Sequence, residues 1–328
     1  MLVKVANTAG MHIVKTVMPL KSKPLIGILT ITLEPLEDSY HVYFELVEEL
    51  TALDVELVVF TPYGINWLNE TVRGFVFKNG TWDRGVTRFP DAVYNRLYGT
   101  NAKTIARLIK MLGEKCVFNH QNRLNKAQVA RILNSSKLEP NLPETNEYSW
   151  DNLAGMLAKY EKVMLKPVYG HYGFNIYQVT QTESQYLVYF ETLRRPHYRF
   201  DKPEQLRNWI EELLLRSHKC VYLVQQYIEP LKIRGRFFDL RVLVQRNAKG
   251  KWAVTAIMSR INRLNYLISN FVYSIADGTE LLKDLGLPRL IDPITEMGID
   301  VGRLLTKKMA MFAEISVDYL IDNNNKPW

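Results

Sequence analysis

Strand-like apolar runs that follow one another with few helices between them dominate the second half of the chain. Only PEQLRNWIEELLLRS and a segment from about Pro293 to Met311 have apolar residues at helical spacing. The remaining apolar runs predict strands, namely KVMLKP, NIYQVT, CVYLVQQYI, FFDLRVLVQR, WAVTAIMSRIN and FAEISVDYLID. Strands in such succession pair largely antiparallel, so this half is predicted to be an α+β domain.

A different order of elements occupies residues 24 to about 115. PLIGILTITL predicts a strand, a helical pattern leads to the strand VELVVF, a turn is expected at Asn79-Gly80, and FPDAVYNRLYG predicts a strand that ends near residues 94–96. Strands that alternate with helices indicate a small α/β sheet of mainly parallel strands. We therefore expect a poorly patterned leader over residues 1–23, an α/β domain over 24–118 and an α+β domain over 119–328.

Composition limits the classes of partner and site. A length of 328 residues suits about two domains at roughly 100–200 residues each. The net charge of +8 suits an anionic partner, which could be a nucleic acid, a nucleotide or an acidic polymer. The two cysteines, Cys116 and Cys220, are far apart and outside any C-x-x-C motif, so neither a disulfide framework nor a zinc site is expected.

The chain has no apolar run near the roughly 18 residues that span a bilayer. The first 24 residues contain lysines but no continuous apolar segment, so they do not resemble a signal peptide. We therefore expect no membrane partner and a cytoplasmic location.

One glycine-containing stretch, KPVYGHYGFNIY, lies between two predicted strands. It does not fit a P-loop, and it has neither the three glycines nor the helix of a dinucleotide fingerprint. Two interpretations remain open. Gly170 and Gly173 could let backbone N–H groups approach phosphate oxygens beside Lys166, or they could only form a hairpin turn.

Three further groups of charged residues allow two interpretations each. Asp239 and Arg241 lie two residues apart and so share one face of a strand, either in a site or in a cross-strand salt bridge. MSRINRLNYLISNF brings together Arg260, Arg263 and Asn270, as a site or as a solvated basic loop. The basic run LRRPHYRFDK could contact an acidic polymer or nucleic acid. A solvated surface is favoured for it, and no nucleic-acid partner is expected, because no nucleic-acid-binding motif accompanies it.

Ten segments in order resemble the YheC/YheD-type group of ATP-grasp proteins, which are associated with the spore coat of Gram-positive spore formers. The segments are LIGILT, DAVYNR, LNKAQVARIL, LPET, LKPVYGHYGFNIYQV, VQQYIEP, FDLRVLVQ, TAIMSRI, SNF and AEISVDYLID. The resemblance covers residues 24 to 328. It implies a pre-ATP-grasp α/β domain, followed by an ATP-grasp domain whose two α+β subdomains clamp Mg-ATP. The lid subdomain would span about residues 145–222.

The resemblance also implies roles for single residues. Lys126 and Lys166 would contact the α/β-phosphates or the adenine edge, and the glycine loop would close over the phosphates through Gly170 and Gly173. The adenine hinge would consist of Gln226, Tyr227 and Ile228. Asp239 would lie at the ribose or pair with Arg241. Arg241, Arg260 and Asn270 would face the transferred phosphoryl group or its acceptor, and Asp318 would be the first magnesium ligand.

The sequence departs from the family pattern in two places. Phe174-Asn175 stands where relatives carry small residues or glycine, so a stiffer loop is expected. The family's Glu-x-Asn metal pair would come just after DNNNKPW, so the resemblance implies a C-terminally incomplete ATP-grasp domain and a weak Mg²⁺ site.

The resemblance implies ligase chemistry, in which ATP converts a carboxylate to an acylphosphate that an amine or thiol attacks. The alternative is a non-catalytic nucleotide-binding or structural protein associated with the spore and its coat proteins. The identity of the substrates does not follow from the sequence.

Overall fold

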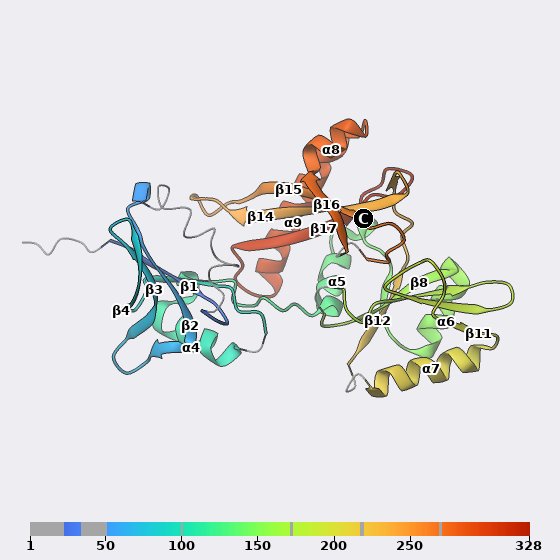
Figure 1. Ribbon diagram of the computed structural model, residues 1–328, viewed down its shortest axis with the longest axis horizontal. Coiled ribbons are helices and arrows are strands. Elements are labelled where there is room, and N and C mark those ends of the chain that lie inside the picture. Colours follow the sequence, from blue (N-terminus) through green and yellow to red (C-terminus); the bar gives the residue numbers. More distant parts are fainter. Residues whose placement is uncertain (1–22, 34–50, 100, 171–172, 217–219, 269–270) are drawn as a thin grey trace, which may run out of the picture. The chain divides into compact units, whose positions relative to one another are not determined.

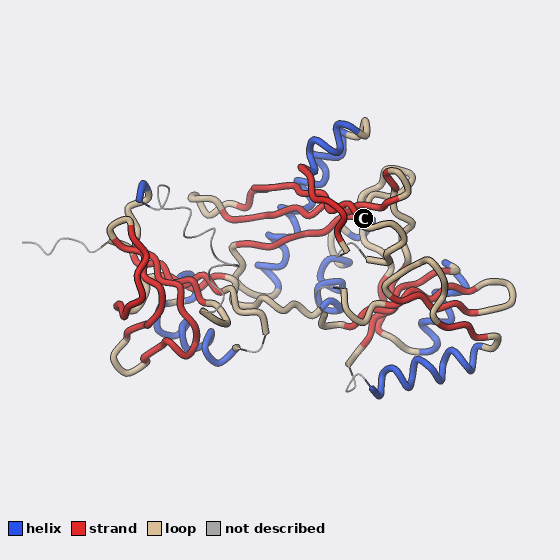
Figure 2. Tube along the Cα trace, in the orientation of Figure 1, coloured by secondary structure: helices blue, strands red, loops and turns tan. Residues whose placement is uncertain are grey.

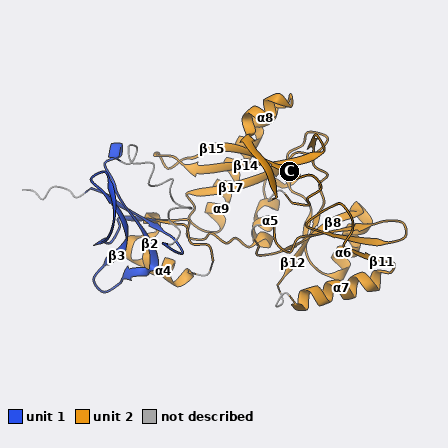
Figure 3. Ribbon diagram, in the orientation of Figure 1, with its two compact units in different colours: residues 1–93 blue, residues 94–328 orange. Residues whose placement is uncertain are grey.

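The computed structural model describes residues 23–33, 51–99, 101–170, 173–216, 220–268 and 271–328 (Figure 1). The chain forms two compact units, residues 1–93 and 94–328 (Figure 3). Nearly all of the expected leader lies outside the described residues, as does most of the helix expected before VELVVF. The domain limits 24–118 and 119–328 follow the family resemblance and stay a prediction.

The first unit contains a mixed sheet with the strand order β4-β3-β2-β1-β5. Its strands are β1 (Leu25–Leu29), β2 (Glu56–Asn66), β3 (Thr71–Lys78), β4 (Thr81–Arg88) and β5 (Ala92–Asn95). β1 and β2 are parallel, but β2, β3 and β4 form an antiparallel meander. The expectation of mainly parallel strands is therefore wrong for this meander, because parallel neighbours need a long crossover and these connections are short turns.

The turn between β3 and β4 is the predicted one. Asn79 and Gly80 both have positive φ, at 54° and 81°. That conformation is typical of the two-residue turn whose twist matches a hairpin, and Asn-Gly adopts it readily.

The second unit begins within β5 and continues through α4 (Ala102–Leu112) and β6 (Val117–Phe118). Side chains attach this segment to the strand β17 (Glu314–Leu320). The hydroxyl of Tyr94 donates to Glu314 Oε1 at 2.8 Å. Asn119 Oδ1 accepts from the backbone N–H groups of Ala313 and Glu314. The segment before the ATP-grasp-like region is thus held by hydrogen bonds to β17 and to the residue before it.

An antiparallel sheet with the order β11-β10-β9-β8-β12-β7 forms the lid region. Its strands are β7 (Thr145–Glu147), β8 (Lys162–Pro167), β9 (Tyr177–Gln181), β10 (Tyr186–Phe190), β11 (Tyr198–Phe200) and β12 (Tyr222–Gln226). The helices α6 (Trp150–Tyr160) and α7 (Pro203–Arg216) pack against it (Figure 2). Leu153, Val163, Val179 and Leu206 are fully buried in this core.

A second antiparallel sheet of this unit runs β17-β14-β15-β16, with β13 (Lys232–Ile233) beside β14. Its long strands are β14 (Arg236–Arg246), β15 (Trp252–Asn262) and β16 (Val272–Asp277). The helices of this part are α5 (Lys126–Asn134), α8 (Gly278–Asp284) and α9 (Ile291–Lys308). The predicted strands FFDLRVLVQR, WAVTAIMSRIN and FAEISVDYLID and the predicted long helix are therefore all present.

Small residues let α9 approach this sheet closely. A Cβ atom at Gly302 would lie 2.9 Å from the ring of Trp252, and one at Gly298 would lie 3.2 Å from Val244. Trp252 and Val244 are both buried in the core that joins α5, α9 and the sheet. Among the described helices, none is long and apolar enough to cross a membrane.

Candidate nucleotide site

A cavity of about 1060 Å³ lies between the lid sheet and the β14–β17 sheet, and all of its lining residues belong to the second unit. Most of the predicted site residues line it. They are Lys166, Gly170, Gly173, Gln226, Tyr227, Ile228, Asp239, Arg241, Arg260 and Asp318. Lys126 adjoins this wall, since its Nζ lies 3.3 Å from the Pro167 carbonyl oxygen. Asn270 lies outside the described residues.

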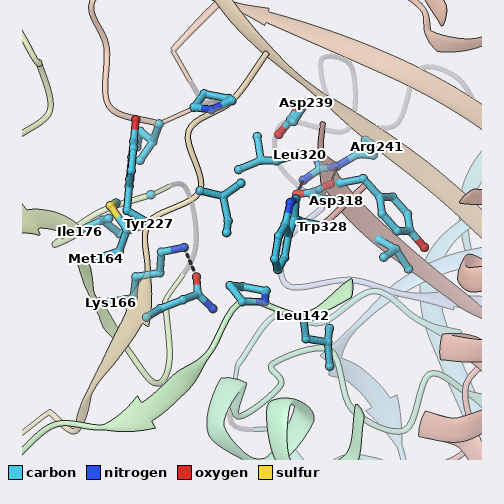
Figure 4. Close-up of a pocket in the computed structure, with 18 of the residues that line it drawn as sticks. Leu142, Met164, Lys166, Ile176, Tyr227, Asp239, Arg241, Asp318, Leu320 and Trp328 are labelled. Atoms are coloured by element: carbon cyan, nitrogen blue, oxygen red, sulfur yellow. Dashed lines mark hydrogen bonds and ion pairs between the residues drawn. The ribbon is translucent and has the colours of Figure 1, made fainter. Parts of the chain in front are cut away.

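Lys166 projects from β8 into the cavity (Figure 4). Its Nζ donates to Gln225 Oε1 on β12 at 2.6 Å, and Gln225 in turn donates through Nε2 to Thr145 Oγ1 at 2.8 Å. That second bond directs the amide oxygen of Gln225 toward the lysine. Burial and, to a smaller extent, the charge of Lys126 lower the pKa of Lys166 to about 8.

Lys126 is the first residue of α5, and the N-cap Asn125 fixes that helix start by accepting from the Gln128 N–H at 3.0 Å. Burial lowers the pKa of Lys126 as well. In the part of the chain that the structure describes, neither ammonium group forms a salt bridge with a carboxylate. Two neighbouring lysines without counter-charges make this end of the cavity suited to an anion.

The glycine stretch connects the antiparallel neighbours β8 and β9, so its topology is that of a hairpin. It also lines the cavity beside the lysines. A Cβ atom at Gly170 would lie 3.4 Å from Lys126 Nζ, so the glycine keeps that ammonium group accessible. Gly173 and Asn175 have positive φ, and Phe174 between them is 65% exposed. The expected stiffness of this loop stays a prediction.

The residues after β12 form an apolar wall with backbone groups at its edge. The Gln226 N–H donates to the Glu144 carbonyl at 2.8 Å, and the Tyr227 N–H points to the Lys162 carbonyl at 3.4 Å. Within the described residues, the Ile228 N–H has no acceptor. Tyr227 lies with Met164 and Ile176 on one side of the cavity (Figure 4). A flat apolar slot with such a donor suits a heteroaromatic ring.

Opposite the lysines, four charged side chains alternate across three strands. Asp239 on β14 faces Arg260 on β15, and Arg241 on β14 faces Asp318 on β17. Both pairs are bidentate, and the two Arg241–Asp318 bonds measure 2.8 Å each. Arg260 Nη2 also reaches Asp318 Oδ2 at 3.0 Å. The partner of Arg241 is thus Asp318, and the expected Asp239–Arg241 pair is wrong, because neighbours on one strand face their cross-strand residues.

Burial differs along this row of charges. Asp239 is 3% exposed and Arg260 is 8% exposed, whereas the Asp318 side chain is 43% exposed. Burial acts to lower the pKa of Arg260, but the carboxylates of Asp239 and Asp318 outweigh it and raise that pKa. Burial acts to raise the pKa of Asp318, but Arg241 and Arg260 outweigh it and hold that pKa below its usual range. Arg260 and Asp318 are therefore both charged at neutral pH.

The described carboxylates do not fit a Mg²⁺ site held by the protein. Mg²⁺ takes octahedral oxygen ligands and is usually held by one or two carboxylates. Both oxygens of Asp318 accept from guanidinium groups, as do those of Asp239. Asp322 accepts from Trp328 Nε1 and from two backbone N–H groups of its own turn. No cluster of three potential ligands occurs among the described residues, so Asp318 as a metal ligand stays a prediction.

Sequence patterns did not indicate the role of Gln225 or of Trp328. Gln225 contacts Lys166 only because β8 pairs with β12 in this register, and no motif encodes that. Trp328 lines the cavity near Asp318 and Leu320 (Figure 4), and its backbone pairs with that of Leu320. The Nζ of Lys326 lies 3.4 Å from the centre of the Trp328 ring.

Comparison with known proteins identifies the family of this chain. The sequence profile of the YheC/D-like ATP-grasp family matches residues 114–328. The chain belongs to this family. It is 26% identical over 329 residues to the endospore coat-associated protein YheD of Bacillus subtilis, and the alignment covers 93% of this chain and 71% of that protein. The family resemblance expected from the sequence is thus confirmed.

Solved ATP-grasp structures share the fold. D-alanyl-alanine synthetase A from Vibrio cholerae matches with a TM-score of 0.51 at 13% identity, over 94% of this chain and 88% of that one. N5-carboxyaminoimidazole synthetase from Staphylococcus aureus matches with a TM-score of 0.54 at 10% identity, over 94% of this chain and 69% of that one. At such identities the likeness shows the fold alone, and it confirms the predicted α/β part followed by an ATP-grasp domain with two subdomains.

Proposed function

We propose that this ATP-grasp protein binds ATP in the cavity between its lid sheet and its β14–β17 sheet. The observation that carries the proposal is the pair Lys126 and Lys166, two partly desolvated ammonium groups without carboxylate partners in the described structure, beside the glycine loop. The phosphates bind there, where charge and backbone N–H groups favour anions. The adenine ring lies against Tyr227 and bonds to the Ile228 N–H. Asp239, which is paired with Arg260, lies at the ribose.

We further propose ligase ancestry, with a carboxylate oxygen attacking the γ-phosphorus of ATP. The bond from that phosphorus to the β–γ bridging oxygen breaks, and ADP leaves. An amine or thiol then attacks the acyl carbon of the acylphosphate and releases inorganic phosphate. Arg241 is placed to stabilise the developing charge, since Nε and Nη2 bind Asp318 and Nη1 makes no described contact.

A second function is favoured by the state of Asp318. Because its carboxylate is occupied by Arg241 and Arg260, the protein could bind nucleotide without transferring its phosphoryl group. Such a protein would be a nucleotide-binding or structural component of the spore. The name of the relative YheD supports an association with the coat, and we propose a spore-associated location on that basis.

Calorimetric titration with ATP, with and without Mg²⁺, tests the nucleotide site. Lys166→Ala should weaken ATP binding about ten- to a hundredfold, as expected for loss of one charge-assisted contact of about 1.5–3 kcal/mol. Lys249→Ala, in the exposed turn between β14 and β15, is the matched control and should bind as the unchanged protein does. Absence of binding by the unchanged protein would refute the nucleotide site.

A second assay separates the two functions. Phosphate release is followed with ATP, Mg²⁺ and mixtures of carboxylates with amines or thiols. Release that depends on both substrates supports the ligase. Nucleotide binding without release under every mixture supports the non-catalytic role.

A further inference from the structure

We propose that a second cavity, lined by three arginines, binds an acidic peptide segment that carries the carboxylate presented to the ATP site. The cavity has a volume of about 600 Å³, and its arginines are Arg194, Arg236 and Arg263. The role as substrate site rests on the proposed function. The binding of acidic peptide rests on the arginine cavity alone.

The three arginines come from separate parts of the second unit. Arg194 lies in the loop after β10, Arg236 begins β14, and Arg263 follows β15. Backbone bonds join the first and third segments, since Leu193 N–H donates to the Asn265 carbonyl at 2.7 Å and Leu267 N–H donates to the Glu191 carbonyl at 2.8 Å. The cavity is therefore built by contact between the lid and the other subdomain, and it is not the surface of one flexible loop.

Two of the guanidinium groups have fixed positions. Arg263 Nε donates to the Val272 carbonyl at 3.3 Å, and its backbone N–H donates to the Phe271 carbonyl at 2.8 Å. The guanidinium of Arg236 lies 4.2 Å from the centre of the Tyr273 ring. Held guanidinium groups lose less conformational entropy on binding an anion than free ones do.

Several described arginines are paired with carboxylates, and the three arginines of this cavity are not. Arg88, Arg207, Arg216, Arg241, Arg260 and Arg303 each form a salt bridge. In the described residues, Arg194, Arg236 and Arg263 form none. Like charges gathered in one hollow repel each other, and a bound polyanion relieves that repulsion.

The arginine cavity adjoins the nucleotide cavity. Val272 lines both cavities. The loop after β15 also contributes to both, because Leu264 and Tyr266 line the arginine cavity while Leu267 and Ile268 line the nucleotide cavity. A peptide held by the arginines can therefore extend one of its carboxylates past Val272 toward Arg241 and the phosphates.

The aromatic residues of this cavity favour carboxylates over nucleic acid. Proteins that bind single-stranded nucleic acid offer open aromatic faces on which bases stack. Here Arg236 covers a face of Tyr273, and Tyr266 packs against Phe271 with ring centres 4.5 Å apart. Tyr273 is still 65% exposed, so the choice of carboxylates rests on the guanidinium forks, which match carboxylates in bidentate geometry. Arg194 and Arg263 are exposed, so the cavity is open to a chain longer than a small molecule.

Fluorescence polarisation of a labelled tetraglutamate peptide tests the proposal, with tetraglutamine as the uncharged comparison. The unchanged protein should bind tetraglutamate, more weakly at high salt, and should not bind tetraglutamine. Arg236→Gln and Arg263→Gln should each weaken tetraglutamate binding about tenfold, the effect of about 1.4 kcal/mol. The matched control Arg289→Gln removes an exposed arginine that lines neither cavity and should bind as the unchanged protein does.

ATP titrations of the same variants separate this inference from the proposed function. Unchanged ATP affinity in all variants, with peptide binding weakened only in the two cavity variants, supports the proposal. Arginine-dependent peptide binding by a protein that fails to bind ATP supports the peptide site but refutes its role as substrate site. No tetraglutamate binding at low salt, or an equal loss in Arg289→Gln, overturns the proposal. Equal binding of an oligothymidylate of the same charge overturns the choice of carboxylate.

Discussion

At the scale of single residues, the site separates two kinds of charge. Burial lowers the pKa of both Lys126 and Lys166, and no described carboxylate forms a salt bridge with either. Asp239, Arg260, Asp318 and Arg241 compensate one another across three strands. The lysines are therefore placed to bind a ligand, whereas the charged side chains on the opposite side of the cavity mostly form salt bridges with one another. Arg241 is at the exposed end of that row of side chains.

Asp239→Asn should strongly destabilise the second unit. Removing one partner of a buried ion pair leaves an uncompensated charge, which costs about 3–5 kcal/mol. Because Arg260 keeps its bond to Asp318, we expect about 3 kcal/mol, at the low end of that range. Urea denaturation followed by tryptophan fluorescence measures the loss. Asp318→Asn, at a side chain 43% exposed, is the comparison and should cost about 1 kcal/mol or less. Equal costs in the two variants would contradict the difference in burial.

ATP affinity should fall as pH rises through the pKa of Lys166, which burial lowers to about 8. The protonated form binds phosphate, so above that pH the affinity decreases up to about tenfold per pH unit. Calorimetry from about pH 7 to about pH 9 measures this, and Lys166→Met should give a weaker and flatter profile. A profile of the unchanged protein that stays flat would refute the role of Lys166.

Stability should depend on the same group with the opposite sign. The unfolded chain holds this proton up to the ordinary pKa of 10.5, whereas the folded chain releases it near pH 8. The unfolded state therefore binds more protons between these values, and the contribution of Lys166 makes the fold more stable as pH rises there. Urea midpoints of the unchanged protein and of Lys166→Met across this interval isolate that contribution.

At the scale of elements, helix α5 connects local sequence to the site. Its cap Asn125 fixes the helix start, and the next residue, Lys126, reaches the Pro167 carbonyl at the end of β8. The α5 backbone also joins β8, because the Lys126 N–H donates to the Val168 carbonyl at 3.1 Å. A shift of the first turn of α5 would therefore move one of the two cationic groups.

Asn125→Ala should lower stability by about 1 kcal/mol, the usual value of an N-cap side chain, and should also weaken ATP binding. Ser149→Ala provides the matched control. Ser149 caps α6 by accepting from the Asn152 N–H at 3.1 Å, and α6 contributes no residue to the cavity lining. Its loss should cost about the same stability and leave ATP affinity unchanged. Thermal unfolding measures the stability of the two variants, and calorimetry measures their ATP affinity. Equal ATP affinities would contradict the link between α5 and the site.

Elements and motifs were predictable from the sequence to different extents. Strong periodicity and turn chemistry predicted the long helix α9 and the Asn79-Gly80 turn. The direction of strand pairing in β2 to β4 was not predictable from alternation alone, because parallel and antiparallel strands have the same side-chain period. The partners of Arg241 and Lys166 depend on the register between strands distant in sequence, and no local pattern encodes that register.

At the scale of the whole molecule, the candidate site depends on two sheets of the second unit. Lys166 and the glycine loop come from the lid sheet, and Arg241 comes from the other sheet. The hinge after β12 leads from one sheet to the next through β13. ATP bound in this cavity would therefore restrict both sheets together.

Hydrogen exchange should detect that joint restriction. ATP should slow amide exchange in β8 and the hinge 226–228 and, at the same nucleotide concentration, near Arg241 and Asp318, because a bound ligand stabilises every element that must open to release it. Strands β2 to β4 supply no described lining residue and serve as the internal control. Lys166→Ala should abolish the effect on both sheets at once. Protection of one sheet alone would show that the nucleotide does not bind between them.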